Sequence, residues 1–213
     1  MITILYEDKS MAVCLKPTGL LSQSGPGEDM LQILGTQLNC TLFPVHRLDR
    51  GVGGVMVFAK TSKAAAALST AIQKGEFNKE YLCVVRGTPA EDTGIYTDLL
   101  LHDKARNKTF VVDRMRGGVK DASLEYRVLA KDKCTSLVRV KLHTGRTHQI
   151  RVQFSSRKTP LLGDGKYGGG SGQIALWSWC LAFPHPTTGK QLYFSYLPEG
   201  DVWDAFPLTA LLS

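Results

Sequence analysis

A short apolar run that follows a cluster of glycines is the feature that most constrains how this chain folds. The run from Val55 to Phe58 is partly β-branched and lacks polar side chains, which is typical of a buried strand. Gly51, Gly53 and Gly54 precede it and give the backbone freedom to turn. Asp49 stands just ahead of these glycines, so its carboxylate faces a region of low dielectric. An ionised carboxylate in such a place needs cations or hydrogen bonds to hold it.

Two arginines flank this acid, in the segment Val45-His46-Arg47-Leu48-Asp49-Arg50. Arg47 and Arg50 are available as partners, although residues so close in sequence need not point the same way. For an isolated Arg-Leu-Asp, a structural ion pair at a turn is the commoner arrangement. Two further segments of the chain favour a catalytic carboxylate instead.

The composition is that of a globular protein with ample core material. Of the 213 residues, 43% are apolar and 21% are charged. Lysine and arginine number 26 against 19 acids, which gives a net charge of +7. This excess suits a polyanionic partner such as nucleic acid, and it is equally consistent with ordinary solubility charge.

The cysteines and the N-terminus indicate the compartment. Five cysteines are scattered along the chain without any C-x-x-C pair, so we expect neither disulfides nor a zinc site. Acids at Glu7 and Asp8 come too early for a signal peptide, and no apolar run is long enough to span a bilayer. We therefore expect a cytoplasmic protein without membrane association. Separately, we expect a monomer.

Strands outnumber helices in the predicted order of elements, and most strands follow one another directly. This order favours an α+β fold with a mixed, mostly antiparallel sheet flanked by helices over alternating βαβ units. No linker divides the chain, so we expect one domain over residues 1–213. Helices are predicted over 30–38, from 61 to about 74, and from 147 or 148 to 156. The clearest strands are predicted over 2–6, 11–15, 55–58, 79–87, 124–129, 136–142, 174–183 and 191–196. An exposed basic segment is predicted over 104–116.

The second suggestive segment runs from Leu142 to Arg151. If Thr147 caps a helix, Arg151 lies near its first turn, where a cation opposes the helix dipole at a cost of up to about 1 kcal/mol. Local rules broken in this way often mark functional sites. A carboxylate partner would compensate, and Asp49 is a candidate. The alternative is a solvated arginine that contacts phosphate or another surface group.

The third segment is Lys79-Glu80-Tyr81, at the start of a predicted strand. Tyr81 alternates with Cys83 and Val85 and so shares their face, where a core aromatic residue is the commoner case. His46 and His148 flank the candidate sites, and we interpret both as hydrogen-bonding scaffold rather than metal ligands.

These segments together resemble the RluA family of pseudouridine synthases, over nearly the whole chain. The motifs that carry the resemblance are His46-Arg47-Leu48-Asp49 with Gly54 and Phe58-Ala59-Lys60; Lys79-x-Tyr81-Leu82 with Val85-x-Gly87; Thr144-Gly145-Arg146-Thr147-His148-Gln149-Ile150-Arg151 with Pro160, Gly163-Asp164 and Tyr167-Gly168; and Leu181-x-Phe183-Pro184-His185-Pro186. Three ordered motifs of this length are a specific signal.

The chain departs from the family pattern at a few positions. The family usually has Thr-Ser at Val52-Gly53, histidine at Gln153 and glycine near Lys158. None of these changes removes a residue with a catalytic role, so they bear on substrate choice. We also expect no S4-type RNA-binding domain.

The resemblance implies isomerisation of uridine to pseudouridine in structured RNA, in a central RNA-binding cleft and without cofactor or metal. Asp49 would be the nucleophile, by attack at ribose C1′ or on the base; both routes stay open. Arg151 would pair with Asp49 and keep it ionised. Tyr81 would stack on the target base and assist proton transfer at C5. The single acid of the aspartate motif favours this chemistry over glycoside hydrolysis, which uses two carboxylates.

The same resemblance indicates how RNA is held. The uridine must leave its stack, and Arg47 would help to hold the RNA opened. Ile150 would form part of the apolar floor, and Arg146 and the segment 104–116 would contact phosphates. The partner would be tRNA or rRNA. The competing hypotheses are an RNA-binding or RNA-folding protein with vestigial catalytic residues and, less strongly, a nucleoside hydrolase.

Overall fold

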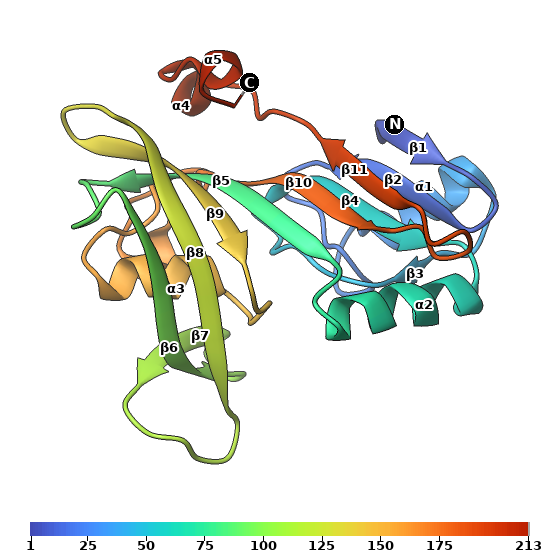
Figure 1. The fold of residues 1–213 in the computed structure, drawn as a ribbon, viewed down its shortest axis with the longest axis horizontal. Helices are drawn as coiled ribbons and strands as arrows, with labels where there is room; N and C mark the ends of the chain where they lie inside the picture. Colours follow the sequence, from blue (N-terminus) through green and yellow to red (C-terminus); the bar gives the residue numbers. More distant parts are fainter. Residues whose placement is uncertain (213) are drawn as a thin grey trace. The chain divides into compact units, whose positions relative to one another are not determined.

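The computed structural model describes residues 1–212, and the chain divides into two compact units. The first unit comprises residues 1–79 and 177–198, and the second comprises residues 80–176 and the C-terminal segment from 199 onwards. Figure 1 shows the elements of both units along the chain.

The first unit is built on strands that are antiparallel except for one pair. Strands β1, β2, β4 and β10 lie side by side in that order; β3 pairs with β4, and β11 pairs with β10. Only β4 and β10 run parallel among these pairs. The bounds are β1 Ile4–Glu7, β2 Met11–Lys16, β3 Phe43–Pro44, β4 Gly53–Ala59, β10 Leu176–Pro184 and β11 Gln191–Ser195.

Two helices accompany this sheet, α1 (Met30–Leu38) and α2 (Ser62–Gln73). Each begins at a side chain that accepts a hydrogen bond from the first turn: Asp29 from the Gln32 N–H, and Thr61 from the Ala64 N–H. All seven residues of β4 are buried. They contribute to a core shared with α2, β2 and β10, made of Met11, Val13, Val55, Val57, Ala59, Ala64, Leu68, Phe77, Leu181 and Phe183.

The second unit contains five strands in the order β5-β9-β8-β6-β7, and the pairs of β6, β7, β8 and β9 are antiparallel. Val152 of α3 and Tyr167 pack against Leu100 of β6 and Ala122 of β8. The bounds are β5 Asn78–Arg86, β6 Thr93–Asp103, β7 Lys108–Val112, β8 Val119–Lys131, β9 Thr135–Leu142, α3 Gln149–Ser156, the 3₁₀ turn η1 Gly165–Tyr167, α4 Asp201–Asp204 and α5 Leu208–Leu212.

The predicted α+β class with a mixed, mostly antiparallel sheet is confirmed. The single domain over residues 1–213 and the central cleft stay predictions. The basic segment 104–116 is mostly exposed, as expected, and it contains β7 paired with β6. One local expectation was wrong. Helix α3 begins one or two residues later than predicted, and Thr147 does not cap it. Within residues 1–212, the helices are too short or too polar to cross a membrane.

Candidate active site

Asp49 lies in a turn whose backbone is held on both sides. The Ser22 hydroxyl accepts a hydrogen bond of 2.9 Å from the Leu48 N–H and donates one of 2.7 Å to the Leu48 carbonyl oxygen. On the other side, the Val52 N–H donates to the Asp49 carbonyl oxygen at 3.0 Å, which closes the turn. The position of the Asp49 backbone is thereby fixed relative to the end of β2 and the start of β4.

A buried lysine holds the same turn from inside. The Lys16 side chain is fully buried at the end of β2, and its Nζ donates to the carbonyl oxygens of Val52 (2.7 Å), Pro17 (3.0 Å) and Arg50 (3.3 Å). Burial lowers the pKa of Lys16 to about 8, and the charge of Asp49 opposes that shift. Sequence reasoning missed Lys16; the signal was a lysine that ends an apolar strand directly before a proline.

The glycines after Asp49 are required by close contact between β4 and β10. Gly54 has a φ of 120°, and a Cβ there would overlap the backbone of Ser178. A Cβ at Gly53 would come within 2.5 Å of the Trp177 ring. The Gly53 departure from the family pattern therefore sits where this chain packs a tryptophan.

His46 and Arg47 differ sharply in environment. The His46 Nε2 accepts a hydrogen bond of 3.2 Å from the Val57 N–H, and its ring packs against Phe77 at 5.6 Å between centroids. Burial lowers the pKa of His46 to about 3, and the charge of Lys79 lowers it further, so the ring is neutral near pH 7. This confirms the scaffold role. Arg47 is exposed.

Tyr81 and Ile150 are both buried in the second unit. Tyr81 is 6% exposed on β5, and Cys83 and Val85 on the same face are buried as well. Ile150 is 4% exposed in the first turn of α3. Burial alone suits a core aromatic residue as well as a stacking one, so the role of Tyr81 stays a prediction.

Arg151 forms a two-pronged ion pair with Asp164. Its Nε donates to Oδ2 at 2.7 Å and its Nη2 donates to Oδ1 at 2.9 Å, and both residues are buried. The expected first-turn cation thus has a carboxylate partner. That partner was not foreseen, although Gly163-Asp164 belongs to the third motif. The pairing of Arg151 with Asp49, which belongs to the other unit, stays a prediction.

The turn before α3 is organised by Gln149 instead of Thr147. Gln149 Oε1 accepts from the Arg146 N–H at 3.0 Å and from the Thr144 hydroxyl at 2.8 Å. The N-cap is His148, in the left-handed region at φ 55°, without a side-chain cap. Arg146 is partly exposed, and its Nε donates to the Asp121 carbonyl oxygen at 2.8 Å.

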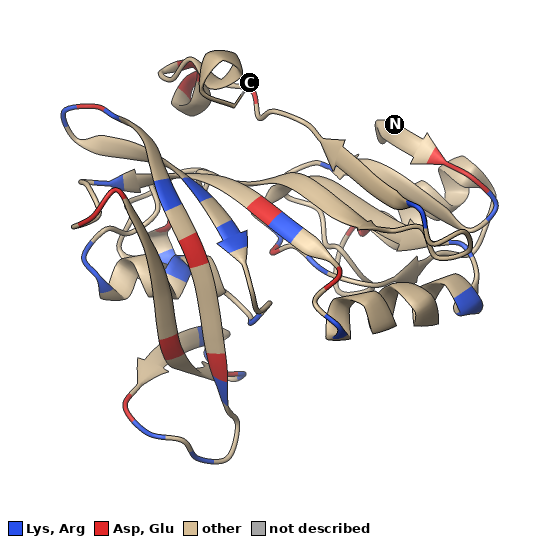
Figure 2. Cartoon of the chain, in the orientation of Figure 1, with Lys and Arg blue, Asp and Glu red and all other residues tan. Residues whose placement is uncertain are grey.

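Exposed basic side chains flank β7, which forms a hairpin with β6. Lys104 and Arg106 precede β7, and Arg114 and Arg116 follow it, all exposed. Figure 2 shows basic segments in blue on the loop that joins β7 to β8. Among residues 1–212, no group of three or more histidine, cysteine or acidic side chains is arranged to hold a metal ion.

The sequence model of the family described as RNA pseudouridylate synthase matches residues 10–156. The chain belongs to this family. The match contains Asp49, Tyr81 and Arg151 in order, and it confirms the resemblance drawn from the three motifs. Members of this family are isomerases that convert uridine to pseudouridine in RNA, which confirms the predicted enzyme class.

Several relatives support the assignment. An uncharacterized RNA pseudouridine synthase of Aquifex aeolicus is 36% identical, over an alignment that covers 91% of this chain and 68% of the relative. The ribosomal large subunit pseudouridine synthase D of Xanthomonas campestris is 32% identical over 90% of this chain and 64% of the relative. The chain thus spans about two thirds of the length of these relatives.

Solved structures show the same fold. The structure of human RNA pseudouridylate synthase domain containing 4 matches with a TM-score of 0.78 and 25% identity, over 92% of this chain and 88% of that chain. Human RNA pseudouridylate synthase domain containing 1 matches with a TM-score of 0.76 at 20% identity, and this second likeness concerns the fold alone.

Proposed function

We propose that this chain isomerises specific uridines in structured RNA to pseudouridine, with Asp49 as the nucleophile. The observation that carries the proposal is the family match over residues 10–156, which includes the aspartate, tyrosine and arginine motifs in their expected order. The fixed turn around Asp49 supports it, because a nucleophile must be held in one place relative to its substrate.

The reaction requires a nucleophile and proton handling, but no net change in oxidation state. Asp49 bonds to ribose C1′ or to the base, and the bond between N1 and ribose C1′ breaks. The base turns, a new bond forms between C5 and C1′, and the bond to Asp49 breaks. C5 then loses its proton and N1 gains one, so the atoms balance. A positioned carboxylate is sufficient as the nucleophile for such a route.

Arg151 and Tyr81 complete the proposed machinery. Arg151 pairs with Asp49, keeps that carboxylate ionised and orients it. Tyr81 stacks on the uracil ring and assists removal of the C5 proton. Ile150 supplies apolar surface beneath the base. These roles fit the buried setting of Tyr81 and Ile150, because an extruded base needs a dry, apolar surface, although a core position would fit it equally.

Basic side chains hold the RNA while the uridine leaves its stack. Arg47 is exposed beside the Asp49 turn and stabilises the opened RNA. Arg146 and the basic residues of the segment 104–116 contact phosphates, consistent with the net charge of +7. Relatives of this chain carry the name ribosomal large subunit pseudouridine synthase D, so large-subunit ribosomal RNA is the first substrate to test and tRNA the second.

The test combines mapping in cells with product analysis in vitro. Pseudouridine is mapped in rRNA and tRNA from cells that lack the protein, and the missing site is then offered to the purified protein as RNA. Pseudouridine as the product supports the proposal. Release of free uracil would contradict the proposal and indicate a nucleoside hydrolase. Unchanged uridine together with tight RNA binding would contradict it and indicate an RNA-folding protein.

A further inference from the structure

We infer that Asp164 and Tyr167 are positioning residues that hold the guanidinium of Arg151 in a single orientation. The inference rests on the proposed function, which gives Arg151 its part in the reaction. All three residues belong to the second unit, so their contacts are defined within one compact body.

Asp164 fixes the plane of the guanidinium. The two parallel hydrogen bonds, 2.7 Å from Nε and 2.9 Å from Nη2, join side chains that are 8% and 0% exposed. A guanidinium group that donates from both Nε and Nη2 to one carboxylate cannot rotate. Its remaining N–H groups point away from Asp164. A lysine at position 151 would have no such edge to hold.

Asp164 is itself anchored through its backbone. Its N–H donates to the Leu161 carbonyl oxygen at 3.1 Å, and its carbonyl oxygen accepts from the N–H groups of Tyr167 (3.1 Å) and Gly169 (2.8 Å). A Cβ at Gly169 would overlap the Leu161 carbonyl oxygen, so this tight loop depends on glycine there. The carboxylate is thus presented from a rigid loop.

Tyr167 supports the guanidinium through its ring. The Cζ of Arg151 lies 5.1 Å from the ring centroid, within the range of a cation–π contact. The Tyr167 hydroxyl accepts from the Thr109 N–H at 2.7 Å and lies 2.9 Å from His148 Nδ1. The hydroxyl is thus within hydrogen-bond distance of two groups on two different elements. These bonds lock the ring between β7 and the start of α3.

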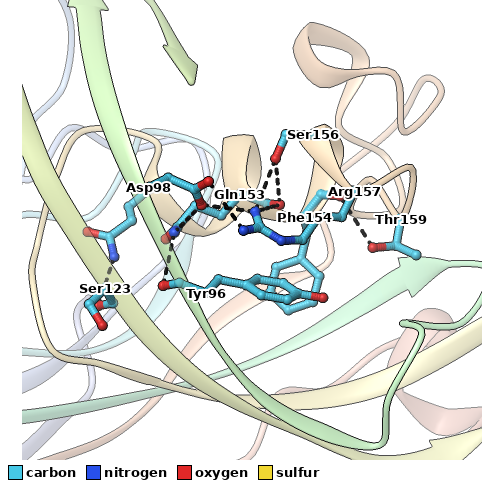
Figure 3. A network of polar contacts seen from close by, with 9 residues as sticks. Tyr96, Asp98, Ser123, Gln153, Phe154, Ser156, Arg157 and Thr159 are labelled. Carbon is cyan, nitrogen blue, oxygen red and sulfur yellow. Dashed lines mark hydrogen bonds and ion pairs between the residues drawn. The ribbon is translucent and has the colours of Figure 1, made fainter. Parts of the chain in front are cut away.

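A second arginine at the other end of α3 shows why the arrangement at Arg151 is more than a structural ion pair. Arg157 also forms a two-pronged pair, with Asp98, at 2.9 and 3.2 Å, and Gln153 donates to the same carboxylate at 2.7 Å (Figure 3). Arg157 follows the last turn, where the helix dipole favours a cation. Arg151 stands in the first turn, where the dipole disfavours one. Helix stability therefore explains Arg157 but not Arg151.

The matched pair of variants is Asp164→Asn and Asp98→Asn, which break two-pronged ion pairs of the same helix, the first buried and the second partly exposed. Each is assayed with the cognate RNA under single-turnover conditions, with RNA affinity and melting temperature measured alongside. We expect Asp164→Asn to lose about 10²-fold in rate, the effect of a misplacement of about 1 Å, with little change in RNA affinity. Asp98→Asn should lower the melting temperature but retain a rate close to that of the parent protein.

A readout that does not depend on turnover follows the guanidinium itself. In protein labelled with ¹⁵N at arginine Nε, the Arg151 Nε–H signal is assigned by its loss in Arg151→Lys. It should exchange slowly in the parent protein and in Asp98→Asn, and be shifted and fast-exchanging in Asp164→Asn. If Asp164→Asn does not fold, Tyr167→Leu takes its place, and we expect this variant to lose rate and to show a shifted Arg151 signal. Tyr167→Phe should be less affected, because the aromatic ring remains.

The outcomes separate this inference from the proposed function. A parent protein that makes no pseudouridine refutes the proposed function, while the Arg151 signal still reports whether Asp164 holds the guanidinium. A folded Asp164→Asn with the parent rate, equal rate losses in Asp164→Asn and Asp98→Asn, or an unchanged Arg151 signal would overturn the positioning role. If Tyr167→Leu is used in place of Asp164→Asn, a rate equal to that of the parent protein or an unchanged Arg151 signal in Tyr167→Leu would also overturn the positioning role.

Discussion

Lys16 donates a hydrogen bond of 2.7 Å from its Nζ to the carbonyl oxygen of Val52, and so joins the end of β2 to the turn that carries Asp49. The ammonium is fully buried and has two further carbonyl partners. A buried cation of this kind makes the stability of the protein depend on pH in a predictable direction.

The first prediction concerns that pH dependence. The pKa of Lys16 is about 8 in the folded protein against 10.5 for an ordinary lysine, so the unfolded state binds more protons between these values. The free energy of unfolding should therefore rise with pH from about 8 to 10.5, by up to about 3 kcal/mol from this group. Urea unfolding of the parent protein and of Lys16→Met gives the difference. A difference that stays constant across this window would contradict the prediction.

Asp49→Asn should abolish turnover and leave RNA binding nearly intact. The amide keeps the shape of the side chain but is a poor nucleophile, so we expect a rate loss of more than about 10³-fold. Tritium release from C5-labelled uridine in RNA measures turnover, and a filter-binding assay measures affinity. Substantial turnover by a homogeneous preparation of the variant would rule out Asp49 as the nucleophile.

Tyr81→Phe should bind RNA normally and turn over poorly. The ring that stacks on the base survives, whereas the hydroxyl that assists at C5 is lost, and general acid–base assistance typically contributes about 10²-fold or more. The same tritium assay measures the rate, with Tyr81→Leu as the variant that also loses stacking. Normal turnover by Tyr81→Phe would restrict the residue to stacking.

Local signals in the sequence were sufficient for the main helices and for the central strand. The apolar helical patterns predicted both helices: α1 begins at Met30 as expected, and α2 begins at Ser62, one residue later than expected, with Asp29 and Thr61 as their N-caps. The run from Val55 to Phe58 predicted β4, because a short β-branched run between turn residues has few other structures available.

Side-chain partners far apart in sequence could not be predicted in the same way. Asp164 reaches Arg151 through a loop that ends in a 3₁₀ turn, and no local pattern specifies that its carboxylate folds back onto α3. Thr147 has a suitable side chain for a cap, but Gln149 satisfies the turn before the helix instead. Lys16 reads as a surface charge until its three carbonyl partners are known.

The acid stability of the first unit should depend on Asp8. Partial burial raises the pKa of its carboxyl, but hydrogen bonds from His185, Ser10 and Met11 outweigh burial and lower the pKa to about 2 from 3.8. The stabilisation is present above pH 3.8 and is lost as the pH falls towards 2. Asp8→Asn should cost about 1–2 kcal/mol at pH 7 and flatten the loss of stability below pH 4. The matched control is Asp103→Asn, which removes an exposed ion pair with Arg106; equal effects in both would contradict the role of Asp8.

The last prediction concerns how the RNA substrate is chosen. A catalytic chain of 213 residues covers a limited patch of RNA, and sequence-specific RNA readout favours loops whose bases are splayed out. Extrusion of a uridine costs least outside regular duplex. A stem-loop should therefore contain everything that the enzyme needs. Because phosphate contacts release counterions, affinity should fall as salt rises.

The experiment compares kcat/KM on an excised stem-loop of roughly 15–20 nucleotides, close to the ~16 bp reach of a double-stranded RNA-binding domain, with kcat/KM on the intact RNA. Values within about tenfold, or 1.4 kcal/mol, would support local recognition. Charge reversal at exposed Arg114 and Arg116 should weaken binding to both RNAs equally and reduce the salt dependence, if these residues contact phosphates. A loss of several orders of magnitude on the stem-loop would instead place the determinants in distant tertiary contacts of the RNA or in a partner protein.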